Sequence, residues 1–204
     1  MLRVAAALTV LAPAAAHADT GFYLGESIGV GLSRDELANV IGQPMHVRVM
    51  AGVRLGNVAI EPWVLTDLQQ DREGAWRGII GGEPAMGSAD ITHYGIDGKY
   101  ILPLDSRLSA YVRGGPSIVE ANGALDGYRG YGFGIGGGLQ VSGRVRALGF
   151  LWSPLFFLNK GPKVTGALFL DQGWDFIRLR KPGAPPINSR IGHVSVGFAV
   201  GSAF

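Results

Sequence analysis

The two ends of the chain alternate between apolar and small or polar residues with a period of two. Near the end of the sequence the apolar residues are Val194, Val196, Phe198, Val200 and Phe204. The positions between them hold small or polar residues, and Ser202 is the one break on the apolar side. Residues 22–32 divide in the same way. Successive side chains of a β-strand point to opposite faces, so this period predicts strands with one apolar face.

The same alternation continues between the two ends. It predicts further strands at 46–55, 58–64, 93–102, 108–113, 130–141 and 145–152. The tight turns expected between them are Gly56-Asn57, Pro103-Leu104-Asp105 and Ser142-Gly143. Residues 164–170 and 174–179 read as one more hairpin around Asp171-Gln172-Gly173, where glycine supplies a positive φ. The strand number must be even, and it is ten if this hairpin crosses a membrane or eight if it belongs to the last loop. We favour ten.

The connections between the predicted strands differ in length. The long ones cover residues 33–45, 69–90 and 120–128, and the others are tight turns. Short turns at one rim and longer loops at the other are typical of outer-membrane β-barrels. We therefore predict an all-β fold, a closed antiparallel transmembrane barrel with short periplasmic turns and longer extracellular loops.

The composition removes several other classes of protein. The chain has 204 residues, of which 47% are apolar and 17% are charged, with 33 glycines and no cysteine. A disulfide framework and a thiolate metal site are excluded. The net charge of +2 is scattered without any run of lysine or arginine, so no nucleic-acid partner is expected.

The first 18 residues are expected to be a cleaved secretory signal peptide. Arg3 precedes an apolar stretch, and the stretch ends in Ala16-His17-Ala18. This small-x-small pattern predicts cleavage between Ala18 and Asp19. The apolar stretch is too short for a membrane helix and contains Pro13. Residues 19–204 are then expected to form a single barrel domain.

The signal, the glycine- and aromatic-rich alternating strands and the ending 194–204 together resemble the small outer-membrane β-barrel superfamily of Gram-negative bacteria, the OmpA/OmpX-like barrels. The resemblance implies an outer-membrane location, with outer-membrane lipid and the barrel-assembly machinery as partners. It also implies that Phe198, Val200 and Phe204 form the terminal signal that this machinery reads. No peptidoglycan-binding domain is expected after the barrel.

A soluble, lipocalin-like barrel would also alternate, with its apolar face turned inward around a ligand. The non-apolar face here is mostly glycine, alanine and serine, whereas a water-exposed surface carries more lysine and glutamate. The pattern therefore favours the membrane barrel. Two residues disagree with it, because Glu26 falls on the lipid side and Pro62 lies within a strand. We expect a bulge at Gly25 that turns Glu26 inward, and a second bulge at Pro62.

The inward positions are expected to carry a nearly balanced set of charges. These are Arg48, Arg54, Glu61, Asp67, Asp97, Lys99 and Arg113. The Gly56-Asn57 turn pairs Arg54 with Ala59 and His46 with Asp67, and a three-residue turn after Leu102 places Asp97 opposite Tyr111 and diagonal to Arg113. Balanced charges satisfy one another, whereas selective pores line up one sign, so we favour a polar plug over a pore. The inward glycines between Gly130 and Gly138 either admit large side chains from other strands or leave a water-filled slot.

Three weaker signals suggest other chemistry. Gly132, Gly134 and Gly137 match a dinucleotide-binding pattern, but the residues alternate as a strand with no helix after them. His46, His93 and His193 face inward on separate strands, so their spacing does not establish a metal site. His193-Val194-Ser195 is similar to the His-x-Ser pair of the outer-membrane lipid A deacylases, but both side chains face the lumen and nothing acidic follows Ser195. We predict no catalytic residue, no metal and no cofactor.

The functional prediction is a non-enzymatic outer-membrane barrel with a mostly occluded polar lumen, contributing to envelope integrity or surface interaction. A narrow porin for water, ions or small solutes is the first alternative. A lipid A-modifying enzyme and a soluble lipocalin-like barrel are the others. The loops 69–90 and 181–190 are the candidate contacts for an extracellular partner, or they fold over the barrel mouth. The oligomeric state stays open.

Overall fold

A computed structural model describes residues 20–35, 37, 44–68, 90–144 and 165–202. Within these ranges the strands are β1 (Gly21–Asp35), β2 (Met45–Leu55), β3 (Val58–Leu68), β4 (Ile91–Pro103), β5 (Leu108–Ala121), β6 (Arg129–Arg144), β7 (Thr165–Arg180) and β8 (Ile187–Gly201). The short 3-10 helix η4 (Gly123–Leu125) lies between β5 and β6. None of the helical residues described forms a helix long and apolar enough to cross a membrane. The predicted signal peptide and Phe204 lie outside the described residues.

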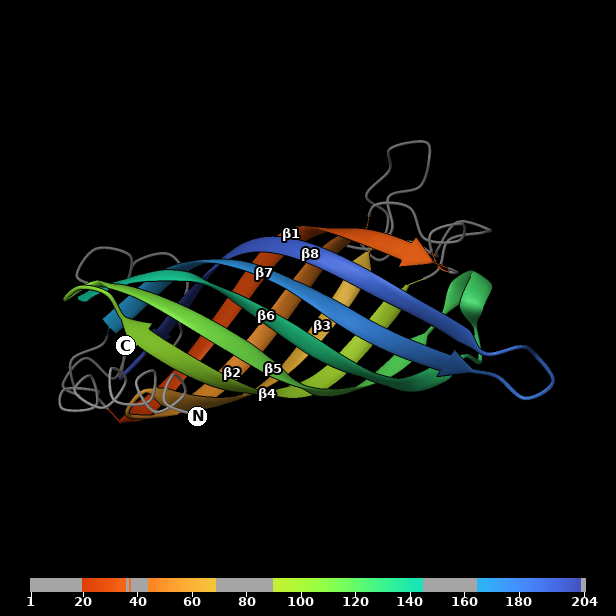
Figure 1. Cartoon of the computed structure of the whole chain (residues 1–204), viewed down its shortest axis with the longest axis horizontal. Helices are drawn as coiled ribbons and strands as arrows, with labels where there is room; N and C mark the ends of the chain where they lie inside the picture. The colour runs from red at the N-terminus through yellow and green to blue at the C-terminus, as the bar shows by residue number, and fades with distance from the viewer. Residues whose placement is uncertain (1–19, 36, 38–43, 69–89, 145–164, 203–204) are drawn as a thin grey trace, which may run out of the picture.

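The eight strands form a closed antiparallel barrel (Figure 1). Each strand pairs with its neighbours in sequence, and β1 pairs with β8 to complete the ring. The predicted all-β closed barrel is therefore confirmed. Tyr23 faces Gly201 where β1 starts and β8 ends. We call this the turn end, because Gly56, with a φ of 67°, and residues 104–107 reverse the chain there.

The opposite end, which we call the loop end, carries the connections from β1 to β2, β3 to β4, β5 to β6 and β7 to β8. Residues 122–128, including η4, and residues 181–186 are described there, whereas 69–89 are not. The predicted loop 181–190 is shorter than expected, because β8 already begins at Ile187. The β6-to-β7 connection belongs to the turn end, and the strand predicted at 145–152 lies in it, outside the described residues.

The preference for ten strands is wrong, because β7 continues without a break through Asp171, Gln172 and Gly173. Gly173 does not turn the chain; it pairs with Gly136 on β6 and with His193 on β8. A Cβ at Gly173 would lie 2.7 Å from the His193 Nε2, so the glycine makes room for that ring. Asp171, Gln172 and Gly173 are therefore consecutive residues of one long strand, and their side-chain positions alternate between the inward and outward faces.

The two predicted bulges are absent. Glu26 pairs with Val49 on β2 and with Phe198 on β8 in unbroken registers, so it remains on the outward face. Pro62 pairs with Ile96 on β4 in a register that is the same on either side of it. The β2–β3 ladder is interrupted beside Pro62 and then resumes unchanged. The missing N–H of proline thus removes local pairing without inserting an extra residue.

The outer face of the barrel is apolar and the inner face is polar. Large hydrophobic side chains stand exposed around the ring, including Phe22 (70% exposed), Val30 (64%), Val112 (62%) and Ile118 (63%). Apart from Glu26, the charged side chains in the middle of the described strands are buried instead. This is the arrangement of a membrane barrel, and it is opposite to a lipocalin, whose apolar face surrounds the ligand.

Two apolar clusters fill the two ends of the lumen. The loop-end cluster is Leu37, Ile91, Val119, Ala121, Leu125, Ile177, Leu179 and Ile191. The turn-end cluster is Tyr23, Met50, Ala59, Trp63, Leu65, Ile101, Tyr111, Phe169 and Ala199. On β4, β5 and β7 the charged residues lie between the two clusters: on β4, for example, Asp97 lies between Ile91 and Ile101. A polar layer is therefore enclosed between two apolar ones.

Candidate functional site

The structure places all seven predicted charged residues inside the barrel. Their exposed fractions range from 0% for Asp97 to 7% for Lys99. The full set is Arg48 and Arg54 on β2, Glu61 and Asp67 on β3, Asp97 and Lys99 on β4, and Arg113 on β5. They are joined by residues that the sequence interpretation did not include, chiefly on β7.

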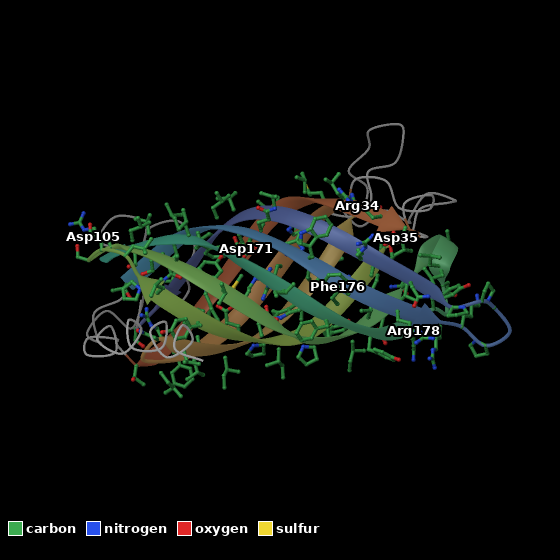
Figure 2. The ribbon with its side chains drawn as sticks, in the orientation of Figure 1. Arg34, Asp35, Asp105, Asp171, Phe176 and Arg178 are labelled. Atoms are coloured by element: carbon green, nitrogen blue, oxygen red, sulfur yellow. The ribbon has the colours of Figure 1, made fainter. Side chains whose placement is uncertain are left out.

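Arg113 is the centre of the network. Its Nη1 donates to Asp97 Oδ2 at 2.8 Å, and its Nε and Nη2 donate to the two oxygens of Asp171 at 3.0 and 2.6 Å. Arg48 Nη2 also donates to Asp97 Oδ2, at 2.8 Å. The Tyr111 hydroxyl donates to Asp171 at 2.8 Å. Figure 2 shows Asp171 in the middle of the barrel, far from Asp105 at the turn end.

A second group surrounds Lys99 and Glu61. Lys99 Nζ donates to Glu61 Oε1 at 3.0 Å, and the Tyr23 hydroxyl donates to the same oxygen at 2.5 Å. The ammonium also lies 4.1 Å from the centre of the Tyr111 ring. Cations are attracted to aromatic faces, so the Tyr111 ring replaces part of the hydration that the Lys99 ammonium loses on burial.

Three histidines lie nearer the loop end. His93 Nε2 is 3.4 Å from Asp67 Oδ2, and His193 lies 3.7 Å from Asp171 and 3.6 Å from Asp175. The His46 and His193 rings meet edge to face with their centres 5.3 Å apart. Within the described ranges no group of three or more histidine, aspartate or glutamate side chains is arranged to hold a metal ion.

The glycines of β6 are covered by large side chains from the strands on either side. A Cβ at Gly136 would lie 3.4 Å from Arg113 Cζ, and one at Gly138 would lie 2.8 Å from the Tyr111 hydroxyl. A Cβ at Gly134 would lie 2.5 Å from Asp175 Oδ1. The glycine wall therefore lets β5 and β7 residues meet across β6. Of the two alternatives left by the sequence, it admits large side chains.

Gly132, Gly134 and Gly137 are all strand residues of β6, with no helix after them among the described residues. This position does not fit the strand-to-helix turn that binds a dinucleotide.

Arg54 lies close to the turn end, where its Nε donates to the Gly56 carbonyl at 2.8 Å.

The sequence interpretation missed Asp171 and Asp175 because it assigned the first of them to a turn. Once β7 is treated as one strand, both fall on the same inward face as Phe169 and Ile177.

The predicted register of β4 with β5 was also wrong. Lys99 pairs with Arg113, and Ile101 with Tyr111, because the turn covers 104–107. Asp97 is nevertheless diagonal to Arg113, so their contact survives the error.

Little space remains inside the lumen. A cavity of about 10 Å³ lies between the charged groups, lined among others by Ser27, His46, Glu61, Arg113 and Asp171. That volume is about the minimum for one water molecule. Among the described residues that line it, Arg113 and Asp171 are joined by hydrogen bonds, as are Lys99 and Glu61.

The fold and the lumen define the class of protein. A closed antiparallel barrel of eight strands, with an apolar belt outside and charged residues inside, is the fold of the small outer-membrane β-barrels of Gram-negative bacteria.

Comparison with solved structures gives the same result. Neisserial surface protein A (NspA) superposes with a TM-score of 0.56 at 16% identity, over 88% of this chain and 96% of that one. Ail of Yersinia pestis matches with a TM-score of 0.47 at 9% identity, over 91% and 99% of the two chains. No protein-family model and no curated protein matches the sequence. The likeness to NspA confirms the small outer-membrane barrel fold and, at this identity, only the fold.

Proposed function

We propose that this protein is a non-enzymatic barrel of the outer membrane whose lumen is closed to solutes. It contributes to envelope integrity or to surface contact. The observation that carries the proposal is the filled lumen, in which Arg113 and its carboxylate partners are enclosed between two apolar clusters.

The charges inside the barrel favour a plug over a pore. Arg48 and Arg113 share Asp97, and Lys99 is paired with Glu61. An ion entering this layer would have to displace partners that are already within hydrogen-bond distance. The apolar loop-end cluster adds a second barrier, because it offers no group to replace the hydration shell of an ion.

A planar-bilayer recording separates the plug from the narrow porin. We expect no steady conductance from folded protein, while a general porin prepared in the same detergent opens channels in the same bilayer. Steady conductance that rises with salt and changes on substitution of Arg54 and Glu61 would overturn the occluded lumen. Swelling of vesicles in small sugars provides a second readout that does not depend on single-channel insertion.

The lipid A-modifying enzyme finds little support in the lumen geometry. His193 and Ser195 are 6% and 4% exposed and face inward on β8, whereas a lipid substrate would reach the outer face. We expect His193→Ala and Ser195→Ala to leave the lipid A profile of the host unchanged. A changed profile with a normally folded barrel would contradict the non-enzymatic assignment.

The outer-membrane location is supported by the apolar belt and by the fold. Heat-modifiable migration tests it: an unboiled sample from the outer-membrane fraction should run as a compact band and shift on boiling. A soluble periplasmic protein without a shift would overturn the membrane assignment. The proposed cleavage after Ala18 is tested in the same material, by the mass of the mature chain.

A further inference from the structure

Exposed arginines gather on one half of the outer face, at the loop end of the barrel. They are Arg34 on β1, Arg129 on β6, Arg178 and Arg180 on β7, and Arg190 on β8. Each lies within three residues of the loop end of its strand. Strands β6, β7, β8 and β1 are consecutive around the barrel, so these residues form one continuous basic arc. Figure 2 shows Arg34 and Arg178 toward the same end, opposite Asp105.

The basic arc is only partly neutralised by its neighbours. Arg190 is paired with Asp35 at 2.9 Å, and Arg129 approaches Glu120 only to 3.7 Å. Within the described part of the chain, Arg178 and Arg180 make no ion pair. Two cross-strand pairs even place like charges opposite each other, Arg34 with Arg190 and Arg129 with Arg180. Such pairs repel, and an anion between them removes the repulsion.

The arc lies directly beside outward aromatic residues. Arg178 pairs with Tyr131 on β6, and Arg190 pairs with Phe176 on β7. The Arg34 guanidinium is 5.3 Å from the centre of the Trp174 ring. Aromatic girdles of outer-membrane barrels mark the boundary between lipid chains and headgroups. The arginines are thus at the edge of the apolar belt, at headgroup level.

The other half of the barrel does not repeat this arrangement. The described outward residues near the loop end of β2, β3 and β4 include Met45, Thr66 and Thr92, all uncharged. Among the residues that the structure describes, the basic surface is therefore one-sided, which a general requirement for solubility does not explain.

We infer that the basic arc binds the phosphate groups of a phosphorylated glycolipid in the outer leaflet, the class to which lipid A belongs. The inference rests on the proposed membrane placement, which makes the loop end extracellular. A lipid fits better than a soluble anion, because its acyl chains would lie against the adjoining apolar belt at Tyr131 and Phe176. Arginine suits the headgroup, since its planar guanidinium binds phosphate oxygens in a bidentate manner.

The test measures lipid binding to folded barrel in neutral detergent by native mass spectrometry. The probes are hexa-acylated lipid A with two phosphates and the same lipid after enzymatic removal of both. The test variant is R178Q/R180Q. The control is R107Q, which removes an exposed arginine at the turn end. An arginine near an anionic lipid surface contributes about fivefold in affinity. We expect about 25-fold weaker binding of bisphosphorylated lipid A to the double variant and no change for R107Q.

Three results would overturn the inference. One is equal binding of the two lipids to the unmodified protein, and another is equal loss in R107Q. The third is displacement of the lipid by millimolar inorganic phosphate, which would make the arc a general anion site. Heat-modifiable migration is recorded for every sample. A barrel that shifts on boiling but ignores the phosphates contradicts this inference alone, whereas the absence of any shift contradicts the proposed function.

Discussion

Replacing Arg113 with methionine tests whether the charged layer stabilises the barrel. Arg113 is 6% exposed and makes three hydrogen bonds to two carboxylates. Methionine keeps much of the volume but leaves Asp97 and Asp171 without their shared cation. Removing one partner of a buried ion pair costs about 3–5 kcal/mol. Because Asp97 keeps Arg48 and Asp171 keeps the Tyr111 hydroxyl, we expect about 3 kcal/mol.

The assay is reversible urea unfolding from phospholipid vesicles, followed by tryptophan fluorescence. A second substitution, D171N, removes one of the uncompensated charges. The double variant R113M/D171N should therefore recover at least about 1 kcal/mol relative to R113M. R107M is the matched control, since an exposed arginine at the turn end should change stability by less than about 0.5 kcal/mol. The reasoning is refuted if R113M unfolds at the same urea concentration as R107M, or if D171N destabilises R113M further.

Three further predictions concern other parts of the molecule. G138V should reduce the folded, heat-modifiable fraction, because its side chain would meet β7 backbone, whereas G143A, with nothing within 4 Å of its Cβ, should fold normally. Hydrogen bonds from Arg190 hold the pKa of Asp35 below its usual value, so this contact is present above pH 4 and is lost as the pH falls through the lowered pKa; carboxyl NMR titration should show a midpoint below about 3.9 that rises in R190Q, and an unchanged midpoint would contradict the pair. Deleting Phe204 should leave the chain in the periplasm as a protease target, and a normal yield in the outer membrane would contradict the terminal assembly signal.

The β2–β3 hairpin shows how far the sequence can predict this fold. A two-residue turn at Gly56-Asn57 determines every later pair, including Arg54 with Ala59 and His46 with Asp67, and the structure has both. Alternation alone does not give the length of a turn. The β4–β5 turn was therefore misjudged, and with it the partner directly opposite Asp97.

The candidate site was less predictable, because its contacts link strands that are not adjacent. The alternation of inward and outward residues places Arg113 and Asp97 in the lumen. It does not predict which side chains reach across an intervening strand to a partner. The sequence interpretation assigned Asp171 to a turn because aspartate and glycine, which occur together at residues 171–173, are both common turn residues. The pairing of Gly173 with both β6 and β8 shows that this segment is part of a strand. That pairing belongs to the tertiary structure and is not encoded in the local sequence.

The contacts that skip a strand also constrain how the barrel is assembled. Arg113 on β5 meets Asp171 on β7 across β6, and Tyr23 on β1 meets Glu61 on β3 across β2. The β4–β5 hairpin contains only part of the network, because Arg113 has Asp97 beside it but Asp171 and Arg48 come from other strands. A hairpin entering lipid alone would therefore leave part of its charge without a partner. The charged lumen thus favours insertion of this chain as a preformed, curved sheet rather than hairpin by hairpin.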